Sequence, residues 1–411
     1  MPIRPNAAPS KNNRTSCGNT KCWTTFSKEW GAPRRRARSS RTSAACKLQL
    51  LRPRRCSELH LAIWARRHSL RVLMRARIFT DRHADLKHLQ GKTCAVIGFG
   101  AQGHAHALNL RDSGLRVLVG LPARSKSRAV ARKHGLEVVS TSEAVARGDI
   151  IFLALSDTEM AGIYDREIAP HLAAGKTLLF AHGFAIFYRT IIPLKDVDVI
   201  LVAPNGVGPM VRREFAEGRG VPGMFAVHQN PSRRAKKIAL AWAKGIGCTR
   251  AGVLETTFKD ETETDLFAEQ AVLCGGVNAL VRSGFETLVD AGYAPEAAYF
   301  ACLHELKFLV DLMHEGGLSG MRARMSPTAT WGDLTIGPRI IDRAVKKNMA
   351  AALQDIQSGK FAREWIRETN TGQKRYHALL KAAEGHPIEQ VGKRLRVSGT
   401  QAFQPVRPAA F

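Results

Sequence analysis

From residue 93 to about residue 228, short and almost continuously apolar runs alternate with stretches of helical periodicity. A strand that is apolar on both faces must be covered on both sides, and helices between successive strands provide that cover in a parallel sheet. The pattern therefore predicts an α/β domain built on a doubly wound parallel sheet. We expect its strands at residues 93–98, 115–121, 136–140, 149–155, 177–181, 197–203 and 224–228.

The strand signals stop near residue 257, and long helical patterns follow. Helices are expected over residues 261–291, 295–315 and 338–357, the first with Leu266, Gln270 and Val277 at helical spacing. The sequence therefore predicts an α/β domain over residues 78–256 and an all-helical domain over residues 257–396. Residues 397–411 contain proline and show no clear period, so they are expected to form a tail.

Residues 98–103 form a complete G-x-G-x-x-G between the first expected strand and the first expected helix. Gly98 permits a tight turn, Gly100 lets a pyrophosphate approach the backbone, and Gly103 allows the helix to pack closely on the strand. The N–H groups at the helix start then face the phosphates. In this context the turn predicts a Rossmann dinucleotide site rather than a plain tight turn, made by Gly98, Phe99, Gly100, Ala101, Gln102 and Gly103.

The loop after the second expected strand, residues 120–128, contains no acidic residue. An NAD site usually places an acidic side chain here, where it holds the ribose hydroxyls. Arg124, Lys126 and the hydroxyls of Ser125 and Ser127 suit a 2′-phosphate instead. The loop therefore favours NADP(H) over NAD, although a basic turn that is merely solvated has the same composition.

Six acidic residues crowd the start of the helical region, between residues 255 and 269. Asp265 and Glu269 are four residues apart, so they project from one face of a helix. Two such carboxylates repel each other unless a cation neutralises them, and their oxygens suit Mg²⁺. Glu305 lies in a later apolar segment. The pattern alone leaves the alternative that these are surface groups, which the positive end of the helix dipole stabilises.

Positive charge is concentrated at the N-terminus. Of the 62 Lys and Arg residues, 19 lie in residues 1–77, beside only two acidic residues, Glu29 and Glu58. This segment has no sustained period, so it is not expected to bury a core. Three interpretations compete: an organelle transit peptide, a basic arm for nucleic acid, or translated sequence upstream of a true start at Met74. We favour the third. It places the protein in the cytoplasm, with no nucleic-acid partner, and no apolar run predicts a membrane span.

Several segments resemble those of class I ketol-acid reductoisomerases. They are residues 98–114 (GFGAQGHAHALNLRDSG), 182–184, 211–222, 255–274 and 302–306. The acidic segment and the helix that follows the glycine turn are highly specific. The resemblance extends over roughly residues 74–396.

The resemblance implies an enzyme of valine, leucine and isoleucine biosynthesis. The family takes a 2-hydroxy-3-keto acid, either 2-acetolactate or 2-aceto-2-hydroxybutanoate. It rearranges this substrate by an alkyl shift that Mg²⁺ assists, and then reduces the 2-keto group with NADPH to give a 2,3-dihydroxy-3-methyl acid. The resemblance also implies two Mg²⁺ ions, a knotted all-helical domain, and a homodimer or larger homo-oligomer that completes the active sites.

The resemblance also assigns roles to single residues. Asp265, Glu269 and Glu305 correspond to metal ligands, and Ser326 to a serine that contacts the substrate. His182 corresponds to the residue usually named as catalytic, although a lone histidine at a strand end is more often structural. Gly208 corresponds to a glycine that contacts the cofactor, and the loop near the cofactor contains Asp157, Thr158, Glu159 and Met160.

Several positions depart from the family pattern. Asn205 replaces a lysine that supplies positive charge near the substrate, and Pro209 replaces a histidine. Ala301 replaces a glutamate that helps to hold the second metal, so that site should be weaker. Pro122 and Met160 replace an arginine and a glutamine beside the cofactor. The alternative hypothesis is a divergent paralogue that binds NADPH but lacks the isomerase step, such as a 2-keto acid reductase.

Overall fold

A computed structural model describes residues 76–397, which lie within one unit of the chain, Met74–Phe411. Almost all of the predicted basic segment at residues 1–77, and all but the first residue of the predicted tail at 397–411, lie outside these described residues. Residues 76–257 hold the strands and residues 258–397 hold only helices and their connections. The predicted fold class is therefore confirmed.

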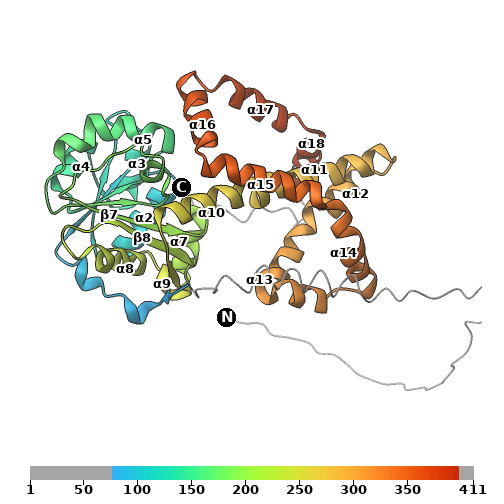
Figure 1. Ribbon diagram of the computed structural model, residues 1–411, viewed down its shortest axis with the longest axis horizontal. Coiled ribbons are helices and arrows are strands. Elements are labelled where there is room, and N and C mark those ends of the chain that lie inside the picture. The colour runs from blue at the N-terminus through green and yellow to red at the C-terminus, as the bar shows by residue number, and fades with distance from the viewer. Residues whose placement is uncertain (1–75, 398–411) are drawn as a thin grey trace, which may run out of the picture. The chain divides into compact units, whose positions relative to one another are not determined.

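The strands form one nine-stranded sheet in the order β1-β9-β8-β7-β6-β5-β2-β3-β4. Figure 1 shows this sheet with helices packed around it. Neighbouring strands from β4 through to β7 are parallel. Every residue of β2, β5 and β6 is buried, as their apolar runs predict. The strands are β1 (Ile78–Phe79), β2 (Thr93–Ile97), β3 (Arg116–Gly120), β4 (Glu137–Val139), β5 (Ile150–Leu153), β6 (Thr177–Phe180), β7 (Asp198–Pro204), β8 (Gly223–Gln229) and β9 (Val253–Glu255).

The sheet is mixed rather than wholly parallel, because β8 runs antiparallel to β7. The prediction of a continuous parallel series is wrong at this strand. The intervening helix α7 (Gly208–Ala216) packs on α2 (Ala101–Asp112) and does not carry the chain back to the start of β7. Instead β8 begins where β7 ends, and the Asn205 N–H donates a hydrogen bond to the Pro222 carbonyl at 2.8 Å.

Helices cover both faces of the sheet and enclose two apolar cores. One core includes side chains of α2, α3 (Ser127–Lys133) and α8 (Ala235–Gly245), with Trp242 and Phe152 at its centre. The other includes side chains of α4 (Thr141–Arg147), α5 (Asp157–Ile163) and the π-helical turn η3 (Tyr164–Ile168). The short helices α6 (Phe184–Phe187) and α9 (Cys248–Ala251) lie in connections after β6 and α8.

The helical region contains nine α-helices within the described residues, two of them preceded by π-helical turns. The predicted helices at 261–291 and 295–315 are interrupted by these turns. The predicted start at residue 338 is wrong, because Pro338 lies near the end of a helix that the sequence did not indicate. The elements are α10 (Phe258–Ala268), η5 (Glu269–Leu273), α11 (Gly275–Asp290), α12 (Pro295–Tyr299), η6 (Phe300–His304), α13 (Leu306–Ala323), α14 (Pro327–Ile340), α15 (Arg343–Gln357), α16 (Lys360–Asn370), α17 (Lys374–Glu384) and α18 (Pro387–Val397).

The first helix of this region packs directly on the sheet region. Phe184 of α6, Leu266 of α10 and Ile356 of α15 share one small apolar cluster. The Tyr188 hydroxyl donates a hydrogen bond to the Ile356 carbonyl at 2.9 Å. These contacts hold α10 beside the chain that leaves β6, and so they position its acidic face. Among residues 76–397, no helix is long and apolar enough to span a membrane.

Candidate active site

The glycine turn connects β2 to α2, as the sequence predicts. Gly98 has φ +97°, and a β-carbon there would collide with the Ala154 carbonyl oxygen. A β-carbon on Gly103 would collide with the Gly98 carbonyl, so glycine is required for the close packing of helix on strand. By contrast, a β-carbon on Gly100 would meet nothing within 4 Å. The backbone is therefore open at the position where a phosphate has to approach.

The start of α7 lies against this turn. A β-carbon on Gly208 would collide with the Ala101 carbonyl. The side-chain amide of Gln102 donates a hydrogen bond through Nε2 to the Gly206 carbonyl at 2.9 Å. The N-cap of α2, Gly100, forms no side-chain capping hydrogen bond. A helix start without a side-chain cap presents N–H groups to an anion. This region therefore fits a dinucleotide pyrophosphate.

The basic loop after β3 divides into structural and exposed residues. The Arg128 guanidinium donates hydrogen bonds to the carbonyls of Leu121 at 2.7 Å and Val139 at 3.0 Å, so it holds the loop to β4. Arg124 and Lys126 are exposed, while Ser125 is partly buried. The exposed pair is the part of the loop that is free to meet a ligand phosphate.

His182 lies just beyond the end of β6, between two carboxylates of α10. Its Nδ1 lies 3.2 Å from Glu261 Oε1 and 3.3 Å from Asp265 Oδ2. The Gly183 N–H donates to Glu261 Oε2 at 2.7 Å. A β-carbon on Gly183 would collide with the Thr262 side chain, so this glycine lets the strand end approach the helix.

Helix α10 begins at a fixed residue because it is capped, and its periodicity places two carboxylates on one face. The Thr257 hydroxyl caps the helix by accepting from the Asp260 N–H at 2.9 Å. Glu261 and Asp265 are four residues apart and share one face, and Glu261 is only 1% exposed. The ligand atoms of His182, Glu261 and Asp265 all lie within 4.8 Å of one another. The carboxylate oxygens gathered here suit a divalent cation, and His182 Nδ1 lies within hydrogen-bonding distance of Glu261.

The centre carries an excess of negative charge. Burial alone would lower the pKa of His182, but its hydrogen bond to the Glu261 carboxylate and the charges of Glu261, Asp157 and Asp265 raise it to about 9. Burial raises the pKa of Asp265 to about 6. His182 opposes this shift, while Glu261, Glu269 and Asp157 add to it. Burial also raises the pKa of Asp157, next to the same charges. Three carboxylates act on His182 and a fourth, that of Glu269, acts on Asp265, so acidic groups outnumber basic ones, an imbalance that favours a bound cation.

The described structure therefore brings together four of the residues predicted from sequence: Asp157, His182, Asp265 and Glu269. It adds Glu261, which the sequence analysis did not select. The available signal was its position four residues before Asp265, on the same helical face. Thr158 and Glu159 lie in the first turn of α5, whereas Met160 is buried against the sheet.

Two other predicted residues lie elsewhere. Glu305 is exposed between η6 and α13, and Ser326 caps α14 by accepting from the Ala329 N–H at 3.2 Å. Within residues 76–397, neither makes a hydrogen bond or ion pair to the His182 centre. Glu269 begins one π-helical turn and Glu305 follows another. Such turns are rare and often occur at functional sites.

Residues 88–252 match the family model described as the NADPH-binding domain of acetohydroxy acid isomeroreductase, and residues 258–399 match that of the ketol-acid reductoisomerase C-terminal domain. The chain belongs to the ketol-acid reductoisomerase family. The resemblance seen in the sequence is therefore confirmed.

Solved structures agree with this assignment. An NADH-preferring ketol-acid reductoisomerase from an uncultured archaeon is 44% identical, with a TM-score of 0.77. The match covers 79% of this chain and 100% of that one. A semialdehyde dehydrogenase NAD-binding protein from Cupriavidus necator is 22% identical, with a TM-score of 0.50. That match covers 67% of this chain and 99% of the other, and it supports the fold alone.

Family membership establishes the class of activity. The protein is an oxidoreductase of the ketol-acid reductoisomerase class, which acts on a small-molecule substrate in branched-chain amino acid biosynthesis. Its first domain binds a nicotinamide dinucleotide, NAD(P)H. The glycine turn and the open start of α2 are the parts of this chain that fit the dinucleotide.

Proposed function

We propose that this reductoisomerase uses NADPH and Mg²⁺ to convert 2-acetolactate, or its ethyl homologue, into the 2,3-dihydroxy-3-methyl acid. The observation that carries the proposal is the His182, Glu261 and Asp265 centre beside the dinucleotide domain. When bound, Mg²⁺ would supply positive charge to the oxygen-rich substrate, and NADPH would supply a hydride for the 2-keto group.

The protein's own residues then have distinct roles. Asp265 and Glu269 would hold the cation, with Glu305 as a further ligand and Ser326 as a substrate contact. Glu261 binds the Gly183 N–H and His182 Nδ1, so it holds the imidazole in place. Because Nδ1 faces carboxylates, the proton on Nε2 is the one that His182 would give to a substrate oxygen.

For the cofactor, we propose NADPH rather than NADH. Exposed Arg124 and Lys126, with the hydroxyls of Ser125 and Ser127, would bind the 2′-phosphate. Gly98 to Gly103, Gly208 and the start of α5 at Asp157 would line the rest of the dinucleotide. The NADH preference belongs to the archaeal relative by its title.

We also propose a homodimer or larger homo-oligomer located in the cytoplasm. Support for association comes from large apolar side chains that are exposed on α14 and its end: Trp331, Leu334, Ile336, Ile340 and Ile341. Exposed apolar residues clustered on one helix are typical of subunit interfaces. The strong positive charge lies in residues 1–77, almost all of them outside the described residues, and we propose no nucleic-acid or membrane partner.

A second candidate is a divergent 2-keto acid reductase that lacks the isomerase step. Two residues favour it. Ala301, in the η6 turn, offers no ligand oxygen to a second metal, and Asn205, at the exposed end of β7, offers no positive charge. The alkyl shift depends most on the metals, so it should be lost first, while simple reduction could continue with one Mg²⁺.

The two candidates are separated by following NADPH oxidation with 2-acetolactate and, in parallel, with 3-hydroxypyruvate. We expect turnover of both substrates, loss of acetolactate turnover with EDTA, and at least a hundredfold loss in Asp265→Asn. Asp290→Asn, an exposed carboxylate at the end of α11, is the matched control and should retain activity. Turnover of 3-hydroxypyruvate alone would replace the first candidate with the second.

A further inference from the structure

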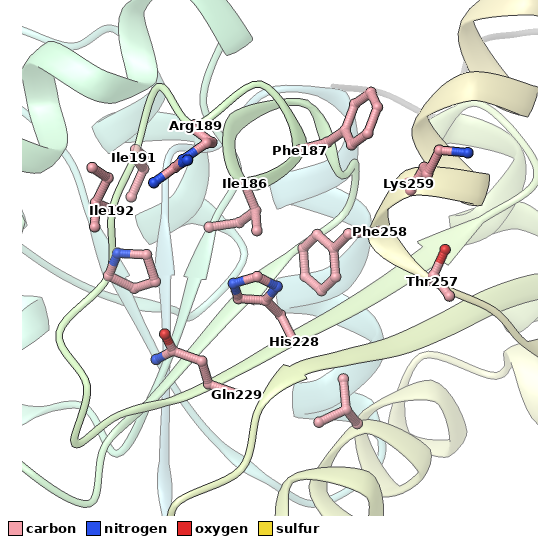
Figure 2. A pocket seen from close by; sticks show the side chains of 12 residues that line it. Ile186, Phe187, Arg189, Ile191, Ile192, His228, Gln229, Thr257, Phe258 and Lys259 are labelled. Atoms are coloured by element: carbon pink, nitrogen blue, oxygen red, sulfur yellow. The ribbon is translucent and has the colours of Figure 1, made fainter. Parts of the chain in front are cut away.

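A cavity of about 550 Å³ lies beside the segment that connects α6 to β7 (Figure 2). Its floor is apolar, because Ile186, Ile191 and Phe258 line it and are almost completely buried. Ile192, which also lines it, is 72% exposed. The connection from β6 to β7 contains only the single helical turn α6, too short to cover the face that β8 presents.

This cavity is separate from the active site. Its lining includes residues 227–229 of β8, which pair with residues 199–200 at the start of β7. His182 and the glycine turn instead follow the carboxyl ends of β6 and β2. The cavity shares helices α6 and α10 with the His182 centre, but different residues of those helices line it. None of the lining residues belongs to the His182 centre or to the glycine turn.

The described lining is basic and contains no acidic residue. Its charged or titratable members are Arg189, His228 and Lys259. Lys259 Nζ lies 3.5 Å from Glu263 Oε1, so its charge is already paired with a carboxylate outside the lining. Arg189 makes no side-chain hydrogen bond or ion pair with any residue between 76 and 397. In Figure 2 Arg189 lies on the side of Ile191, across from His228 and Phe258.

The backbone at Arg189 is strained. Its φ is +58°, a left-handed conformation that only three non-glycine residues adopt among the described ones. A side chain in this region carries a free-energy cost that glycine would avoid. The chain therefore keeps a charged side chain without a protein partner, on strained backbone, beside an apolar cavity. The left-handed turn follows the end of α6, where the Arg189 N–H donates to the Ile186 carbonyl at 3.2 Å. The Arg189 side chain is exposed, so its guanidinium is accessible to an anion at the mouth of the cavity.

We propose that this cavity is a second ligand site, which binds a small monocarboxylate with an apolar chain. The guanidinium of Arg189 binds the carboxylate through two parallel hydrogen bonds, a geometry for which arginine is suited. The chain packs on Ile186, Ile191 and Phe258, and its burial adds to the affinity. The apolar floor excludes inorganic phosphate as the preferred ligand, and the lack of carboxylates excludes a cation.

The test uses octanoate as the probe. Three matched compounds show separately what the negative charge and the apolar chain each contribute to binding. Octanol keeps the chain without the charge, acetate keeps the charge without the chain, and octylammonium reverses the charge. Calorimetry measures affinity on the full-length protein, and methyl spectra of isotope-labelled isoleucine locate the ligand. We expect octanoate to shift the methyl signals of Ile186, Ile191 and Ile192, and to bind at least tenfold more tightly than the others.

Two variants of Arg189 test the anchor. Arg189→Gln keeps a side chain on the strained backbone and should weaken octanoate binding at least tenfold, leaving octanol unchanged. Arg189→Gly should also lose octanoate binding while raising the melting temperature, because glycine relieves the strain. Arg116→Gln, an exposed arginine at the start of β3, is the control and should bind normally.

The proposal would be overturned by equal binding of octanol and octanoate, by an unchanged affinity in Arg189→Gln, or by methyl shifts confined to isoleucines outside the cavity. If Arg189→Gln folds poorly, its melting temperature will show this. Arg189→Gly, which is expected to be more stable, then decides whether the guanidinium is needed.

Discussion

His106 shows how much one residue's surroundings control its chemistry. It is fully buried in α2, stacks on Phe152 with ring centroids 4.4 Å apart, and accepts a hydrogen bond from the Trp242 indole at 3.1 Å. Burial lowers the pKa of His106 to about 3. An unfolded histidine has a pKa of about 6.5. Between these pH values the unfolded chain binds a proton that the folded chain does not.

It follows that His106 destabilises the fold as the pH drops below about 6.5, by at most about 1.4 kcal/mol per pH unit. His106→Gln keeps a hydrogen-bond acceptor for Trp242 but cannot titrate. Between about pH 6 and pH 4.5, we expect its free energy of unfolding to fall by ~2 kcal/mol less than that of the wild type. Urea unfolding at several pH values measures this difference. An equal effect in exposed His377→Gln would contradict the assignment.

Arg124 and Lys126 are the residues on which the cofactor preference is expected to depend. Replacing both with glutamine removes two charges from the loop after β3 but keeps Arg128, which holds the loop in place. We expect KM for NADPH to rise at least tenfold, or about 1.4 kcal/mol, while KM for NADH stays the same. Steady-state kinetics with both cofactors measures this. A parallel rise for NADH would indicate that the loop binds no 2′-phosphate.

The sequence predicted the role of single residues correctly where only one residue type can adopt the required backbone position, as with glycine in the turn. Gly98 and Gly103 permit contacts that any β-carbon would block, so their spacing was informative. Glu261 was missed because its importance comes from a hydrogen bond to Gly183, 78 positions earlier in the chain. Its spacing of four residues from Asp265 places it on the same helical face, but the spacing does not show that the carboxylate is buried or that it binds the Gly183 N–H.

At the scale of elements, Lys176 closes the end of α4. Its ammonium donates to the carbonyls of Val145 and Ala146, each at 3.0 Å, and to that of Gly148. The last carbonyls of a helix lack partners within the helix, and a cation there also interacts favourably with the helix dipole. One side chain just before β6 therefore joins a helix to the neighbouring strand.

Lys176→Met should lower the free energy of unfolding by about 1–2 kcal/mol, because partly buried carbonyls lose their donor. Thermal and urea unfolding measure this change. The control is Lys195→Met, at an exposed position in the connection before β7. Equal destabilisation by the two variants would show that loss of surface charge, and not the cap, is responsible.

The elements also show where periodicity stops being informative. The apolar runs predicted the strands well, but not the direction of β8, which follows from α7 packing on α2. The helical patterns of residues 261–291 and 295–315 extend through η5 and η6 without any visible break. A π-helical turn changes the hydrogen-bond spacing from four residues to five, and the apolar pattern of the side chains does not show this change.

At the scale of the whole molecule, the exposed apolar side chains of α14 should be covered by a second copy of the chain. Trp331 is 71% exposed and Leu334 is 56% exposed. Trp331→Arg would bury an unpaired charge in that interface, at a cost of several kcal/mol. We expect the wild type to sediment as a dimer or larger species and the variant to dissociate at micromolar concentration.

Analytical ultracentrifugation measures the change in assembly. Leu194→Arg, an exposed apolar residue of the sheet region, is the matched control and should leave assembly unchanged. If the wild type sediments as a monomer, or if both variants dissociate alike, α14 is not the interface.

The sequence by itself determined the fold class, the glycine turn and the family, because these depend on local periodicity and on residue types that few others can replace. Only the tertiary structure decided which carboxylates meet His182 and which way β8 runs. It also decided that Arg189 faces a cavity with no protein partner. Each of these depends on contacts between residues far apart in the chain. The residue types and periodicity of a short segment do not specify which distant groups it will contact.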